Sequence, residues 1–121
     1  MKEKILFVNS CVRGENESRT LALAKTALSR LDGDIEEIRL ADADLKPLDA
    51  AGLAKRAESA EKNDFSDPVY DCAKQFAACD TVVVAAPFWD YSFPAFLKIY
   101  IESLCVGGLT FLYGSDGVPI S

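Results

Sequence analysis

Residues 81–94 read TVVVAAPFWDYSFP, and this stretch indicates a strand, a loop and the start of a helix. Its first half is a strongly apolar, β-branched run, which predicts a strand. Pro94 then suits the first turn of a helix. Between strand and helix lie Phe88, Trp89 and Tyr91, although turns usually favour Gly, Asn, Ser and Asp. These bulky residues require an explanation beyond turn formation.

The hydrophobic pattern outside this stretch predicts two more strands, several helices and a hairpin. We expect strands at 4–10 and 35–40, helices beginning at Ser18, around 51–61, at Ser66-Asp67-Pro68 and at Pro94, and a short hairpin within 107–121. Parallel strands need right-handed helical crossovers. The order therefore predicts an α/β domain with a parallel sheet covered by helices.

Helical periodicity also predicts which side chains face the core. In the first helix these are Leu21, Ala24, Leu28 and Leu31. In the helix that begins near Pro68 they are Val69, Cys72, Phe76 and Cys79.

Composition narrows the class of protein. The 121 residues suit one domain, and a net charge of −6 with scattered basic residues argues against nucleic acid as a partner. The absence of histidine removes imidazole metal sites, so we expect no metal. No apolar run is long enough for a signal sequence or a membrane span. The four cysteines form no C-x-x-C pair, which predicts reduced, mostly buried thiols in a cytoplasmic protein without zinc.

Two loops are expected at the carboxyl ends of the strands, where parallel sheets gather their ligands. The first, at 9–18, enters a helix whose first turn favours an anion. Ser10, Asn16 and Ser18 add donors there, and Arg13 or Arg19 could add charge, so a phosphate monoester would fit. An ordinary capped helix start explains the same residues equally well. Neither G-x-x-x-x-G-K-[ST] nor G-x-G-x-x-G is present, which excludes a P-loop and a dinucleotide fingerprint.

A phosphatase loop is a third alternative for this segment. Low-molecular-weight tyrosine phosphatases carry C-x5-R-[ST] after their first strand. Here the fifth residue after Cys11 is followed by Glu17 in place of the arginine that clamps the phosphate. Cys11 is therefore expected to be a packed residue, not a nucleophile.

The second loop, at 87–93, could hold a flat ring. Aromatic faces stack on such rings, and backbone amides bond their edges. With a phosphate in the first loop, FMN is a suitable ligand. The alternative is that the aromatic residues belong to the core or to a dimer contact. Asp90 fits poorly in a core.

Three motifs in this part of the chain resemble those of the FMN-dependent NADH-azoreductase and NAD(P)H:quinone oxidoreductase family of flavodoxin-like proteins. The family patterns are A-x-P-[MF]-[YW]-N-[FY], L-K-x-[YW]-x-[DE] and G-[VL]-T-F-x-Y. This chain has Pro87-Phe88-Trp89-Asp90-Tyr91, Leu97-Lys98-Ile99-Tyr100-Ile101-Glu102 and Gly108-Leu109-Thr110-Phe111-Leu112-Tyr113.

The resemblance implies a flavodoxin-like three-layer sandwich, a homodimer, FMN as cofactor and NADH or NADPH as electron donor. By position, the FMN phosphate would be held by Ser10, Asn16, Glu17 and Ser18, and the ring lined by Phe88, Trp89, Asp90 and Tyr91. The flavin would perform the chemistry without a catalytic side chain and pass two electrons to a quinone, azo or similar aromatic acceptor by a ping-pong mechanism. The alternative is a non-enzymatic, flavodoxin-like electron carrier or association module.

The chain departs from the family pattern in two places. Asp90 stands where Asn is usual, and a carboxylate beside the ring would lower the flavin potential. The flavodoxin-like order 2-1-3-4-5 also needs two strands after the hairpin. We therefore expect residues 1–121 to be the N-terminal portion of a single domain, truncated after the fourth main helix and the hairpin. Residues 81–86 would then form an open sheet edge, and the chain alone would bind FMN weakly or not at all.

Overall fold

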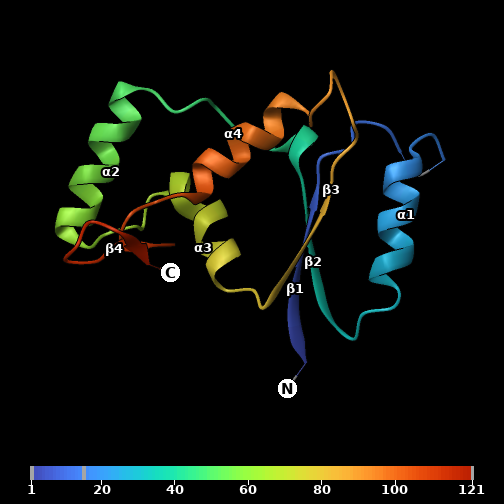
Figure 1. The fold of residues 1–121 in the computed structure, drawn as a ribbon, viewed down its shortest axis with the longest axis horizontal. Coiled ribbons are helices and arrows are strands. Elements are labelled where there is room, and N and C mark those ends of the chain that lie inside the picture. The colour runs from blue at the N-terminus through green and yellow to red at the C-terminus, as the bar shows by residue number, and fades with distance from the viewer. Residues whose placement is uncertain (1, 15, 121) are drawn as a thin grey trace. The chain divides into compact units, whose positions relative to one another are not determined.

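The computed structural model describes residues 2–14 and 16–120 of the chain, and its elements follow the predicted order (Figure 1). The strands are β1 (Glu3–Asn9), β2 (Gly33–Arg39), β3 (Thr81–Ala85), β4 (Leu112–Tyr113) and β5 (Pro119–Ile120). The α-helices are α1 (Arg19–Leu28), α2 (Ala50–Lys62), α3 (Asp71–Ala77) and α4 (Ala95–Leu104), and the 3₁₀ turns are η1 (Leu40–Asp42) and η2 (Pro68–Tyr70).

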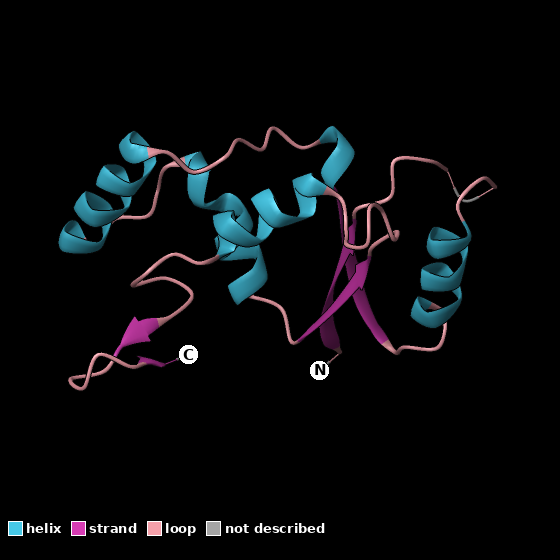
Figure 2. Ribbon diagram, turned by 45° about the horizontal axis from the view of Figure 1, so that its top comes forward, coloured by secondary structure: helices cyan, strands magenta, loops and turns pink. Residues whose placement is uncertain are grey.

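The three long strands form a parallel sheet in the order β2-β1-β3. Ile5 of β1 pairs with Ile35 on one side and with Thr81 on the other, so the strand that begins the chain is central. Within the described residues β3 lies at the sheet edge, which confirms that prediction. The predicted hairpin is also confirmed, because β4 and β5 pair antiparallel (Figure 2).

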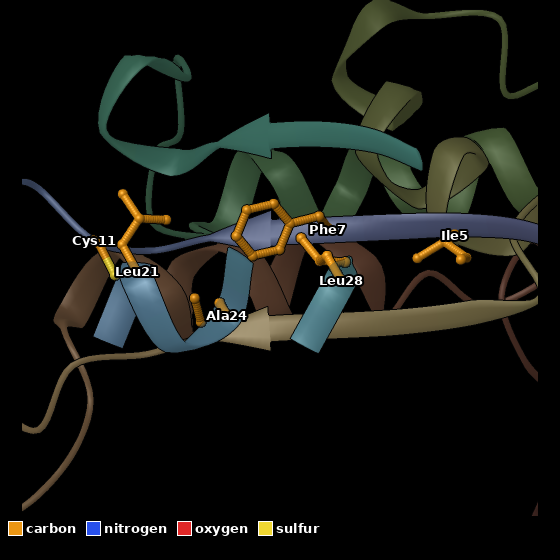
Figure 3. Close-up of a cluster of buried hydrophobic side chains, with 7 residues drawn as sticks. Ile5, Phe7, Cys11, Leu21, Ala24 and Leu28 are labelled. Atoms are coloured by element: carbon orange, nitrogen blue, oxygen red, sulfur yellow. The ribbon is translucent and has the colours of Figure 1, made fainter. Parts of the chain in front are cut away.

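One core lies between the sheet and α1 (Figure 3). Its buried members come from β1, the following loop, α1 and β3, and they are Ile5, Phe7, Cys11, Leu21, Ala24, Leu28 and Ala85. The apolar face of α1 is thus confirmed as far as Leu28. Leu31 is exposed, so its predicted burial is wrong. The reason is that α1 ends at Leu28 and the chain has already turned toward β2.

The chain divides into two compact units. The first contains the residues up to Leu45 together with Ala78–Lys98, and so holds the parallel sheet and α1. The second contains Lys46–Ala77 and the residues from Ile99 onward, with a small core of its own. In that core Tyr70, Ala73 and Val106 are buried, and Phe65 and Leu109 pack against them.

The predicted buried face of α3 is partly wrong. Val69 is exposed, whereas Tyr70 and Ala73 are the buried residues of this segment. Pro68–Tyr70 forms a 3₁₀ turn with about three residues per turn, so the α-helical spacing assumed from the sequence does not continue through it. Cys72, Phe76 and Cys79 are half-buried.

The structure also tests the predictions for α2 and for the four cysteines. No residue of α2 is buried, as expected for a solvated helix. All four cysteines are unbridged, but only Cys11 is buried and Cys105 is exposed. Among the described residues, no helix has both the length and the apolar character needed to cross a bilayer.

Candidate functional site

The first loop leaves β1 through two buried polar residues, Asn9 and Ser10. The backbone N–H of Ser10 donates to the carbonyl of Ala85 in β3 at 3.0 Å, and its hydroxyl donates to the same oxygen. Ser10 therefore joins the carboxyl ends of the two strands, and its hydroxyl proton is already used within the protein. The N–H of Cys11 donates to Asn9 Oδ1 at 3.0 Å, which fixes the first step of the loop.

A tight turn at Gly14 leads the loop into α1. The N–H groups of Glu17 and Ser18 donate to the Gly14 carbonyl at 3.0 and 2.9 Å. Ser18 is the predicted N-cap, and its Oγ accepts from the N–H of Leu21 at 3.1 Å. Because Oγ acts there as an acceptor, its own proton remains available to an anion beside the helix start. The side chains of Asn16 and Glu17 are exposed.

Replacing Ser18 separates the capping role from anion binding. Ser18→Ala removes the cap, so we expect the free energy of unfolding to fall by about 0.5–2 kcal/mol and FMN binding to weaken. Ser18→Asp keeps a capping oxygen but places a carboxylate at the anion site. Thermal denaturation should show a stable Ser18→Asp protein, while an FMN titration should show weakened binding. Unchanged FMN affinity in both variants would place the anion elsewhere.

The second loop contains a two-residue reverse turn. Trp89 and Ser92 exchange both backbone hydrogen bonds at 2.8 Å, and the residues between them have left-handed backbones, with φ 50° at Asp90 and 64° at Tyr91. Two positive φ values in succession define a type I′ turn, which favours Asn and Gly. Asp tolerates this conformation, whereas Tyr does so at a cost. The turn therefore gives a structural reason for an Asx residue at position 90.

The aromatic residues of this turn face solvent. Phe88 is 75% exposed and Tyr91 93% exposed, and their rings lie edge to face with centroids 6.0 Å apart. Trp89 and Phe93 are also exposed. The alternative that these side chains fill the core is therefore wrong. An exposed aromatic cluster of this kind marks a surface for a ligand or a partner.

Relief of the strained turn should stabilise the protein. Tyr91→Gly removes a left-handed penalty of about 1–2 kcal/mol and adds an entropic cost of about 0.5–1 kcal/mol. We expect a net gain between about 0 and 1.5 kcal/mol in the free energy of unfolding, measured by chemical denaturation. Tyr91→Ala is the control, because it removes the ring but keeps the Cβ atom. A Tyr91→Gly protein less stable than Tyr91→Ala by the full entropic cost of glycine would show that the backbone is unstrained.

The two loops meet at a small pocket of about 20 Å³, lined by Cys11, Val12, Arg13, Ser18, Pro87 and Trp89. The structure thus brings together Ser18 and Trp89, one from each predicted half of the site. Asn16, Glu17, Phe88, Asp90 and Tyr91 do not line this pocket, and Ser10 is buried. The pocket has room for about one water, so a larger ligand would lie across the surface that the loops form.

Asn9 is a residue that the sequence reasoning missed. A polar residue that ends a buried apolar strand was the available signal, but only the fold shows its partners. Its Nδ2 donates to Glu37 Oε2 at 3.1 Å, and Lys25 forms an ion pair with Glu37 Oε1 at 3.2 Å. Burial alone would raise the pKa of Glu37. Hydrogen bonds from Asn9 and Lys25, with the charges of Lys25 and Arg39, together lower this pKa below its ordinary value.

Comparison with known proteins identifies the family. Residues 3–120 match the family model described as the flavodoxin-like fold. The chain belongs to this flavodoxin-like family. The expected fold class is therefore confirmed, as is the family resemblance read from the sequence.

Several flavodoxin-like relatives are similar over nearly the whole chain. An FMN-dependent NADH:quinone oxidoreductase of Clostridium perfringens (strain SM101 / Type A) is 31% identical over 119 residues, covering 94% of this chain and 60% of the relative. FMN-dependent NADH:quinone oxidoreductase 2 of Clostridium acetobutylicum is 32% identical over 120 residues, covering 94% and 59%. The crystal structure of an azoreductase from Bacillus anthracis str. Sterne superposes with a TM-score of 0.74 and 25% identity, covering 98% of this chain and 62% of that one. The chain thus spans about three fifths of the length of these relatives.

Proposed function

We propose that the protein is an FMN-dependent NAD(P)H oxidoreductase that passes two electrons to a quinone, azo or similar aromatic acceptor by a ping-pong mechanism. The observation that carries this proposal is the shared pocket of Ser18 and Trp89. It places a helix start suited to an anion beside an aromatic turn suited to a flat ring. The names of the curated relatives support the same cofactor, donor and acceptor class.

The donor set of the first loop fits the phosphate of FMN. In our proposal the Ser18 hydroxyl, the Asn16 amide and the first-turn N–H groups of α1 donate to the phosphate, and Arg13 supplies positive charge. The Ser10 hydroxyl and the Glu17 N–H are bonded within the protein, so they would contact the phosphate only by exchanging those bonds.

The aromatic turn would hold the ring end of the cofactor. Trp89 faces the shared pocket, and Phe88, Asp90 and Tyr91 extend the surface beyond it. When bound, FMN supplies the capacity to accept a hydride and to reduce an acceptor. The side chains of this protein would orient FMN and would leave one face of its ring open to nicotinamide and acceptor.

The same proposal includes a single domain, a homodimer and a cytoplasmic location. Residues 1–121 would belong to one domain, since the family match runs through both compact units without a break. A homodimer in the cytoplasm is proposed, with the exposed aromatic cluster available to a second subunit.

Cofactor loading tests the proposal. Because residues 1–121 are expected to bind FMN weakly, the purified protein is kept in an excess of FMN, and the absorption spectrum of the bound flavin should differ from that of free FMN. That spectrum should bleach when NADH is added without oxygen, and a quinone or azo dye should restore it. Bound FMN that NADH does not reduce would support the electron-carrier alternative, and an absence of binding even in a large excess of FMN would refute the enzyme proposal for this chain.

The charge of Asp90 offers a further prediction. Asp90→Asn preserves a residue that accepts the left-handed backbone and removes a negative charge next to the proposed ring site. We expect the midpoint potential of bound FMN to rise, because the carboxylate opposes the charge that reduction adds. Asp32→Asn is the control, since Asp32 precedes β2 at the opposite end of the sheet. A fall in potential would mean that Asp90 does not face the flavin.

A further inference from the structure

The side-chain amide of Asn9 occupies a position with a single compatible orientation. Asn9 is 1% exposed, its Oδ1 accepts from the Cys11 N–H at 3.0 Å, and its Nδ2 donates to Glu37 Oε2 at 3.1 Å. A reversed amide would place its NH₂ group against an N–H and its oxygen against a carboxylate. The Cys11 N–H and the carboxylate of Glu37 therefore determine together which way the Asn9 amide points.

The second oxygen of the same carboxylate is also bonded. Glu37 Oε1 accepts from Lys25 Nζ at 3.2 Å, and Lys25 lies in α1, the helix that follows the first loop. Lys25 Nζ also lies 5.4 Å from the centre of the buried Phe7 ring, a cation–π contact that limits its freedom. One side chain of β2 thus holds the residue before the loop and the helix after it.

We propose that Glu37 is a positioning residue for the anion loop, residues 10–18, acting through Asn9 at the loop's entrance and Lys25 beyond its exit. The proposal rests on the proposed function only in naming FMN as the ligand. An ion pair as exposed as Lys25–Glu37 contributes little to stability. The effect of Glu37 is therefore on the geometry of the loop, and ligand affinity should respond more strongly than stability.

A reversal of donor and acceptor provides the sharpest test. Asn9→Asp alone places two carboxylates against each other where an amide–carboxylate hydrogen bond now exists. Adding Glu37→Gln restores a bond in the opposite direction, from the Gln amide to the Asp carboxylate, while the other Asp oxygen still accepts from the Cys11 N–H. The neighbouring Glu36→Gln is the matched control, because successive side chains of a strand point to opposite faces.

Two measurements are made on each protein. The dissociation constant for FMN is obtained from quenching of flavin fluorescence, and the hydrogen-exchange protection of the Cys11 amide from NMR. We expect Asn9→Asp to weaken FMN binding about five- to tenfold and to reduce Cys11 protection. The double variant should recover to within about threefold of the wild type, and Glu36→Gln should change neither quantity.

The outcomes distinguish this inference from the proposed function. Failure of the double variant to recover Cys11 protection overturns the positioning role, whatever happens to FMN. If the wild type binds no FMN, the proposed function fails, but recovery of Cys11 protection still supports the positioning of the loop by Glu37. Full recovery of protection without recovery of FMN affinity would overturn the link between loop order and binding.

Discussion

Phe7→Ala should lower the free energy of unfolding by about 3–5 kcal/mol, the range for an aromatic residue deleted from a packed core. Phe7 is fully buried in β1, the central strand, and belongs to the core cluster beneath α1. Its removal leaves a cavity between sheet and helix and takes away the ring below Lys25 Nζ. Chemical denaturation measures the change, which is a large fraction of the roughly 5–15 kcal/mol that stabilises most domains.

Leu23→Ala is the matched control for Phe7→Ala. Leu23 lies on α1 but is 71% exposed, so its truncation should change the free energy of unfolding by less than about 0.5 kcal/mol. Comparable losses in the two variants would contradict the assignment of the core to one face of α1.

Arg56→Lys should destabilise the second unit by about 1–3 kcal/mol. Arg56 lies in α2, and its Nη1 and Nη2 donate to the carbonyls of Cys105 and Glu102 at 3.1 and 2.8 Å. These carbonyls lie at the C-terminal end of α4, where a cation also complements the helix dipole. Lysine keeps the charge but lacks the planar fork that reaches both oxygens.

The control is the opposite substitution, of a lysine by an arginine, on the same helix. Lys62→Arg changes a residue near the end of α2 whose ion pair with Glu58 is exposed, so we expect a change below about 0.5 kcal/mol. Denaturation followed by the fluorescence of the tyrosines would measure both variants. An Arg56→Lys protein as stable as the wild type would show that charge alone holds the end of α4.

The fold could be predicted because its signals are local. The apolar runs of β1 and β3 and the N-cap at Ser18 determine where strands end and α1 begins, and the structure confirms them. Which side chains are buried was harder to predict where the backbone departs from the regular period of an α-helix. The 3₁₀ turn before α3 is the clearest case, since it moves Tyr70 inward in place of Val69.

The sequence predicted which two loops form the candidate site, but not the geometry of their turns or their hydrogen bonds. Sequence spacing brought Ser18 and Trp89 to neighbouring loops, and the pocket contains both. The turn at Asp90 and Tyr91 could not be predicted, because a left-handed Tyr contradicts local preference and depends on the two hydrogen bonds that flank it. The partner of the Ser10 hydroxyl was equally hidden, since Ala85 is distant in sequence and adjacent only in the sheet.

The central position of β1 has a consequence for synthesis on the ribosome. β2 can pair with β1 soon after both have emerged, but β3 follows about 45 residues later, an interval of roughly 2–10 s at ordinary rates of translation. Throughout that interval one side of β1 has no neighbour, and its alternate side chains Leu6 and Val8, buried in the finished protein, lack part of their cover. The nascent chain is then most exposed to chaperones and to other nascent chains, and slower translation of the segment between β2 and β3 should lower the yield of folded protein.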